Sequence, residues 1–186
     1  MERREFIKIT GVGTLAFSTA AFNTSCAVPS WVVTAEGIAS VGVNIAAGVI
    51  DIVDPVLAPL VDAVKGGFNA VLKALQDYQA ALATDPNPIT LLEAVKVAFA
   101  TLQADAAALL QQFNSQGGVL NATIASIIAL IAQAVANIGN LIPAQLKAGL
   151  KASNLFPPAN DWAKGDFKAR YNDIVKKSDN KKLHKI

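Results

Sequence analysis

Residues 55–84 of the chain read PVLAPLVDAVKGGFNAVLKALQDYQAALAT, and residues 90–115 read TLLEAVKVAFATLQADAAALLQQFNS. In both segments the large apolar residues recur every three or four positions, which places them along one face of an α-helix. Between the segments stand Asp85, Pro86, Asn87 and Pro88, which together indicate a turn. Two amphipathic helices of similar length joined by a short turn predict an antiparallel helical hairpin.

Local signals refine the ends of these two helices. Asp54, which precedes a proline, predicts the cap of the first helix, and Thr90 with Glu93 forms a capping-box pattern for the second. The glycine pair at 66–67 predicts a kink or a close helix crossing. The glycine pair at 117–118 predicts the end of the second helix.

An apolar helix is expected on each side of the hairpin. The earlier one, from Ser30 to about Val53, contains three glycines, each of which costs about 1 kcal/mol of helix propensity relative to alanine. The later one runs from an Asn121 cap to about Asn140. It is apolar nearly all round, apart from a thin polar line formed by Ser126, Gln133 and Asn137. A helix of this kind is either a central core helix, which we expect in this chain, or a membrane-inserted or oligomer-forming one.

The end of the chain differs in charge from its body. Residues 27–146 contain three lysines and eight acidic residues, whereas residues 147–186 contain ten Lys or Arg and four acidic residues. A short helix from Pro143 and a longer one at about 161–177 are expected there. In the longer helix an apolar face containing Phe167 and Tyr171 predicts docking on the bundle, with the lysines in water. The alternative is attraction of the lysines to anionic lipid or to an acidic partner, and nucleic acid is not expected.

These elements predict an all-α fold: an alanine-rich up-down bundle of about four main helices plus a helical, basic C-terminal tail. Aromatic residues make up only 6% of the chain against 53% hydrophobic residues, so alanine and aliphatic side chains must fill the core. The expected division is a signal segment over 1–26, a helical bundle domain over 27–153 and the basic tail over 154–186.

The first 26 residues, MERREFIKITGVGTLAFSTAAFNTSC, resemble a twin-arginine (Tat) signal. The family pattern is Ser/Thr-Arg-Arg-x-Phe-Leu-Lys, and the residues that match it are Arg3, Arg4, Phe6 and Lys8, with Ile7 in place of leucine and Glu2 in place of Ser/Thr. The resemblance implies export through the Tat machinery to the periplasm or cell envelope. A retained membrane-anchoring helix and an ordinary Sec signal are the alternatives.

Cys26 is the one cysteine of the chain, and it stands where a lipoprotein signal places its acylated cysteine. We expect a lipid on Cys26 to anchor the protein in the membrane, since two acyl chains hold a protein firmly. A cut at the small-x-small site formed by Ser25, Cys26 and Ala27 would instead remove the cysteine.

Catalysis has little support in the sequence. The one histidine, His184, stands in a lysine-rich end that we expect to fray, so it cannot serve as an oriented catalytic imidazole. Neither the phosphate-binding glycine loops nor the EF-hand pattern is present. We therefore predict no catalytic, cofactor-binding or metal-ligating residue and no cofactor.

Three functions remain. The first is a non-catalytic structural or accessory bundle that acts through a protein partner or through self-association. The second is a bundle that binds lipid or another apolar ligand, or acts on membranes. The third is an enzyme that uses carboxylates such as Asp62, Asp77, Glu93 or Asp105, for which solvated helix faces are the simpler explanation.

Overall fold

The protein folds as a bundle of α-helices. The computed structural model describes residues 28–85, 87–116, 121–147 and 155–186, and within these residues it contains helices and no strand. The main helices are α2 (Ser30–Val49), α3 (Ala58–Ala81), α4 (Ile89–Ser115) and α5 (Ala122–Leu141), followed by the single turn α6 (Ala144–Lys147) and by α7 (Lys164–Lys177). The predicted all-α class is confirmed.

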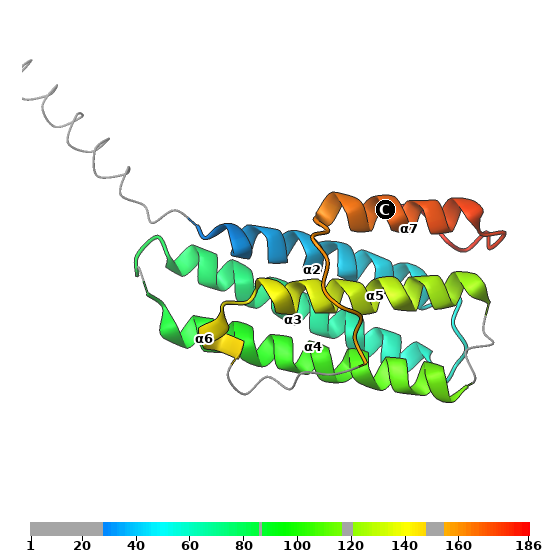
Figure 1. The fold of residues 1–186 in the computed structure, drawn as a ribbon, viewed down its shortest axis with the longest axis horizontal. Helices are drawn as coiled ribbons and strands as arrows, with labels where there is room; N and C mark the ends of the chain where they lie inside the picture. The colour runs from blue at the N-terminus through cyan, green and yellow to red at the C-terminus, as the bar shows by residue number, and fades with distance from the viewer. Residues whose placement is uncertain (1–27, 86, 117–120, 148–154) are drawn as a thin grey trace, which may run out of the picture.

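The four main helices run alternately up and down, as the colours in Figure 1 show. Helix α2 packs against α3 and α5, and α4 packs against the same two helices from the other side. The hairpin predicted from the two amphipathic segments is the pair α3 and α4. Helix α7 lies outside this bundle, alongside α2 and α5 (Figure 1).

The position of α7 explains why α2 and α5 are so apolar. Helix α2 contacts α3, α5 and α7, and α5 contacts α2, α4 and α7, so each has neighbours on most of its circumference. Ten side chains of α5 are buried, among them Ile127, Ile131 and Val135. Both helices are long and apolar enough to cross a membrane, and about half of each is buried inside the protein. A core helix passes the same test of length and composition.

One of the predicted helix caps is confirmed and two are wrong. Asp54 does not cap α3, because this helix begins at Ala58 with Leu57 at its N-cap position; the Asp54 side chain instead accepts a hydrogen bond from the N–H of Leu57 at 3.0 Å, in the preceding turn. Asn121 accepts one from the N–H of Thr123 at 3.0 Å and caps α5. The capping box at Thr90 does not form, because α4 begins directly after Pro88. Thr90 is then already inside the first helical turn, where it cannot act as a cap.

Several other predicted features differ from the structure or lie outside it. Helix α2 ends at Val49 rather than near Val53, and a turn follows in which the N–H of Ile52 bonds to the carbonyl of Val49 at 3.0 Å. The glycine pair at 117–118 lies outside the described residues. So does the signal segment, with the export-motif residues Arg3, Arg4, Phe6 and Lys8 and with Cys26. The signal and its lipidation remain predictions.

The glycine pair at 66–67 marks a close helix crossing. A Cβ at Gly67 would lie 3.0 Å from the backbone Cα of Leu102 on α4, whereas a Cβ at Gly66 would meet nothing within 4 Å. The absence of a side chain at Gly67 therefore allows α3 and α4 to approach each other. Gly42 serves the same purpose between α2 and α3, because a Cβ there would lie 2.5 Å from the ring of Phe68.

This difference within the pair predicts opposite effects of the same substitution. Gly66→Ala is expected to stabilise the protein by about 0.5–1 kcal/mol, because alanine restricts the unfolded chain and favours the helix. Gly67→Ala is expected to destabilise it by about 1–3 kcal/mol, because the backbone of α4 cannot move away. Urea unfolding of both variants measures the two changes, and equal effects at both positions would contradict the close crossing.

Candidate functional site

Asn137 on α5 holds the chain segment that precedes α7. It is 2% exposed, and among the described residues it is the one polar residue that is buried. Its Nδ2 donates to Asn160 Oδ1 at 2.8 Å and to the carbonyl of Trp162 at 3.2 Å. Its Oδ1 accepts from the N–H of Asn160 at 2.9 Å. The amide therefore has partners for both of its ends, which is what a buried side-chain amide requires.

Gln133, one turn earlier on α5, extends this contact. Its Nε2 donates to Asn137 Oδ1 and to the carbonyl of Pro158, each at 3.0 Å. Two members of the polar line noted in the sequence thus fasten residues 158–162 to α5. We call these hydrogen bonds the amide clasp. They join the side chains of Gln133, Asn137 and Asn160, the N–H of Asn160 and the carbonyls of Pro158 and Trp162.

Aromatic packing completes the attachment of α7. Phe167 and Tyr171 have no exposed surface, which confirms that the apolar face of this helix docks on the bundle. Trp162 lies just before the helix and packs edge-on against Phe167, with the ring centroids 5.4 Å apart. The guanidinium of Arg170 lies 3.5 Å from the centroid of the Trp162 ring, in a cation–π arrangement.

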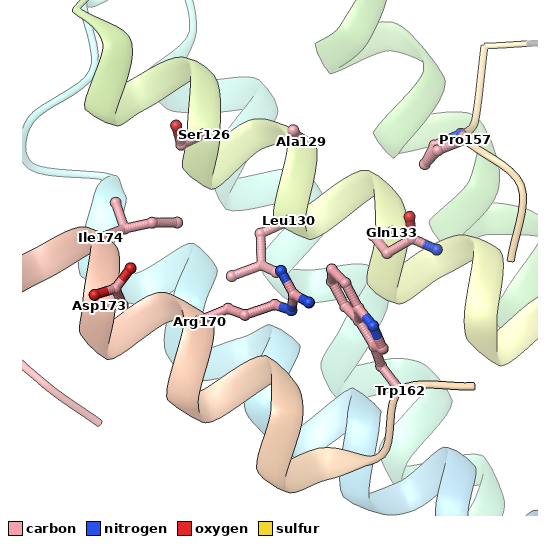
Figure 2. Close-up of a pocket in the computed structure, with 9 residues that line it drawn as sticks. All are labelled: Ser126, Ala129, Leu130, Gln133, Pro157, Trp162, Arg170, Asp173 and Ile174. Atoms are coloured by element: carbon pink, nitrogen blue, oxygen red, sulfur yellow. The ribbon is translucent and has the colours of Figure 1, made fainter. Parts of the chain in front are cut away.

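Together these contacts create an open groove of about 410 Å³ between α5 and α7. Figure 2 shows Arg170 reaching from α7 toward Trp162, with its guanidinium between Leu130 of α5 and the Trp162 ring. The residues that line it are Ser126, Ala129, Leu130, Gln133, Pro157, Trp162, Arg170, Asp173 and Ile174. The groove combines an apolar floor with polar groups of both hydrogen-bonding types, and we take it as the candidate functional site.

The cation in this groove is free to bind an anion. Among the described residues, no carboxylate lies within ion-pair distance of Arg170. The nearest candidate along α7, Asp173, is paired with Lys177 at 2.7 Å. A guanidinium stays protonated at any physiological pH and presents several N–H donors in one plane. The groove thus offers a fixed positive charge beside an aromatic face.

The Tyr171 side chain brings a hydroxyl without a hydrogen-bond partner to the contact between α7 and α2. The hydroxyl of Tyr171 is buried and, within the described structure, makes no hydrogen bond. It points at Gly48 of α2, where a Cβ would overlap it. Burial raises the pKa of this hydroxyl above its ordinary value, because the phenolate would lose its hydration. Gly48 therefore provides the space into which the Tyr171 ring fits.

The carboxylates that the sequence offers for catalysis do not meet at a site in the described structure. Asp62, Asp77 and Glu93 are each ion-paired with a lysine on the same helix, at 3.5, 2.9 and 3.6 Å respectively. Asp105 is half-buried on α4, and burial raises the pKa of its carboxyl. Within the described residues no group of three or more His, Cys, Asp or Glu could hold a metal ion.

The last residues of the chain are ordered rather than frayed, contrary to our expectation. Leu183 is buried, and the Asn172 side chain holds Ile186 by accepting from its N–H at 3.0 Å and donating to its carbonyl at 3.2 Å. The expected fraying fails because one asparagine of α7 supplies both partners for this backbone. His184 is exposed on this segment.

The sequence pattern predicted part of this site and missed the rest. Ser126, Gln133 and Asn137 stood out as a polar line without a role, whereas nothing in the pattern singled out Asn160 or Arg170. One signal was present: an asparagine inside an otherwise apolar core helix must find hydrogen-bond partners outside that helix.

Comparisons with known proteins add no function to this groove. No family model, no curated protein and no solved structure matches this chain. A function must therefore be inferred from the groove and from the surfaces around it.

Proposed function

We propose that this protein is an exported, non-catalytic helical bundle of the cell envelope that acts by binding a protein partner. The observation that supports this function best is the groove between α5 and α7, which is built on the outside of the bundle. Rigid hydrogen bonds and aromatic contacts hold its walls before any ligand arrives. Such preorganisation lowers the entropic cost of binding.

The chemistry of the groove favours binding over catalysis. Its charged groups are the guanidinium of Arg170 and the carboxylate of Asp173, which is exposed and ion-paired. General acid–base catalysis needs a group that exchanges protons near the working pH. Tryptophan and arginine are instead two of the residue types that are enriched at energetically important positions of protein interfaces.

Membrane attachment through the predicted signal is the second part of the proposal. Cys26 stands shortly before Ser30, where α2 begins, so a lipid on Cys26 would tether the bundle through a short link. Metabolic labelling with a palmitate analogue is expected to label the wild-type protein and not the Cys26→Ser variant. An unlabelled wild-type protein would rule out this anchor.

Cross-linking mass spectrometry on the native membrane fraction tests the partner. We expect cross-links from Lys164, Lys168 or Lys177, which are exposed on α7, to a second protein or a second copy of this one. Lys73, exposed on α3 in the hairpin, serves as the internal control and is expected to cross-link less. A protein that remains strictly monomeric and uncross-linked in its native membrane would contradict the proposal.

The second candidate is a bundle that binds lipid or another apolar ligand. Its support is that α2 and α5 both have the length and composition of membrane spans. Native mass spectrometry of gently purified protein separates the two candidates. A bound lipid mass would favour the second candidate, and a bare protein mass would exclude it.

A further inference from the structure

We infer that the groove between α5 and α7 binds an extended, acidic peptide segment of the partner, with a carboxylate on Arg170 and an aliphatic side chain on the floor. This inference rests on the proposed function and names the chemistry of the partner. Three observations support it: the charge of the surrounding surface, the mixture of donors and acceptors, and the shape of the floor.

The surface around the groove favours an acidic ligand. Residues 155–186 contain eight Lys or Arg and four acidic residues. Lys164, Lys168, Lys176 and Lys177 are all exposed on α7. Helix α7 packs on α2 and α5, and these two helices contain a single acidic residue, Glu36. The positive charge of α7 is therefore little offset by the helices that it contacts, and it would attract an acidic chain.

The hydrogen-bonding groups of the groove distinguish a peptide from a fatty acid. Arg170 supplies donors, whereas Gln133 donates through Nε2 to the clasp and keeps its Oε1 as an acceptor. Ser126 donates to the carbonyl of Ala122 at 2.8 Å, so its oxygen can also accept. A fatty-acid carboxylate has acceptors alone and would leave these acceptors unused. A peptide has N–H donors along its backbone as well as a carboxylate, and it satisfies both kinds of group.

The floor fits one apolar side chain beside the acidic one. Leu130 of α5 and Ile174 of α7 point into the groove from its two sides (Figure 2), and Ala129 of α5 also lines it. The volume of about 410 Å³ lies within the range of small ligand sites, so it accommodates a few residues rather than a folded domain. Arg170 then lies between the floor and Trp162, where a bound carboxylate would be partly shielded from water and held more strongly.

The test uses the peptide acetyl-Ala-Leu-Glu-Leu-Ala-amide and the ¹⁵N-labelled full-length chain. We expect saturable shifts of the Arg170 Nε–H and Trp162 indole N–H signals at millimolar peptide. Exchanging the glutamate of the peptide for glutamine, or the substitution Arg170→Gln, is expected to weaken binding about tenfold or more, since a charge-assisted hydrogen bond is lost. Lys176→Gln, on the same helix but outside the groove, is the matched control and is expected to change affinity less than about twofold.

Two further arms make the result decisive. Dodecanoate at the same concentration tests the lipid alternative, and vesicles of phosphatidylglycerol test a membrane surface. Unchanged signals with the peptide, shifts that survive Arg170→Gln, or shifts caused by dodecanoate or vesicles and not by the peptide would each overturn the inference. If the peptide fails while cross-links to a partner persist, the partner binds another face and the proposed function stands. If the cross-links also fail, the proposed function fails with it.

Discussion

Replacing Gly48 with alanine is expected to destabilise the protein by about 1–3 kcal/mol and to loosen α7. The new Cβ would overlap the Tyr171 hydroxyl, and Tyr171 is fully buried, so its ring cannot swing into water. The gain in helix propensity from replacing glycine offsets the cost by at most about 1 kcal/mol. Chemical denaturation measures the loss, and amide hydrogen exchange in residues 164–177 localises it.

The variant Tyr171→Phe turns this prediction into a double-mutant cycle. Without the hydroxyl, the nearest atom of the ring to a Cβ at Gly48 is Cζ, at 3.2 Å, so alanine fits with a small adjustment. Gly48→Ala is therefore expected to be nearly neutral in the phenylalanine background, a coupling of about 1–3 kcal/mol. Tyr171→Phe alone is expected to stabilise the protein slightly, because it removes a buried hydroxyl without a partner. Additive effects of the two substitutions would show that α7 does not dock on Gly48.

The same hydroxyl predicts how stability depends on alkaline pH. The pKa of Tyr171 is raised by burial in the folded protein, whereas it is ordinary, about 10, in the unfolded chain. The unfolded chain therefore loses this proton first, and the free energy of unfolding should fall as the pH rises through about 10. Tyr171→Phe is expected to lose less stability than the wild type between about pH 8 and pH 11. Parallel curves for the two proteins would contradict burial of the hydroxyl.

The fold was predictable for those helices that bury a single apolar face. The stripes that contain Phe68 and Leu102 identified α3 and α4 as a hairpin, because each of these helices buries a single face. Helix α5 was ambiguous for a physical reason. A helix covered by three neighbours and a helix covered by lipid select the same side chains, so the sequence around Ile127 and Ile131 fits both. The difference lies in α7, a separate element that covers α2 and α5.

The groove was much less predictable than the fold. Its walls depend on hydrogen bonds between Asn137 and residues 23 and 25 positions later in the chain. No periodicity connects such residues, and nothing in the spacing of Trp162 and Arg170 requires that they meet on α5. The sequence could predict only that the buried side-chain amide of Asn137 requires hydrogen-bond partners. Which residues meet that need is decided by where the segment before α7 lies along α5.

Replacing Asn137 with leucine is expected to lower the free energy of unfolding by about 3 kcal/mol, the upper end of the range expected for Gly48→Ala. Leucine has a similar size, so the core remains filled, but the N–H of Asn160 and the carbonyl of Trp162 lose their partners in a half-buried place. An unpaired buried polar group costs about 1–3 kcal/mol, and in this variant two backbone groups are affected at once. Residues 158–162 should then detach from α5, and α7 should lose its anchor at one end.

Ser126→Ala is the matched control for this variant, because Ser126 belongs to the same polar line but is exposed and bonds within α5 alone. Its effect on the free energy of unfolding is expected to stay within about 0.5 kcal/mol. In Asn137→Leu, amide exchange at Phe167 and Tyr171 should accelerate far more than exchange in the α3–α4 hairpin, since α7 would open without unfolding the bundle. The same variant should also abolish peptide binding, because Trp162 and Pro157 form one wall of the groove. If Asn137→Leu keeps wild-type stability and protects α7 as before, aromatic packing alone holds α7 and the amide clasp is dispensable.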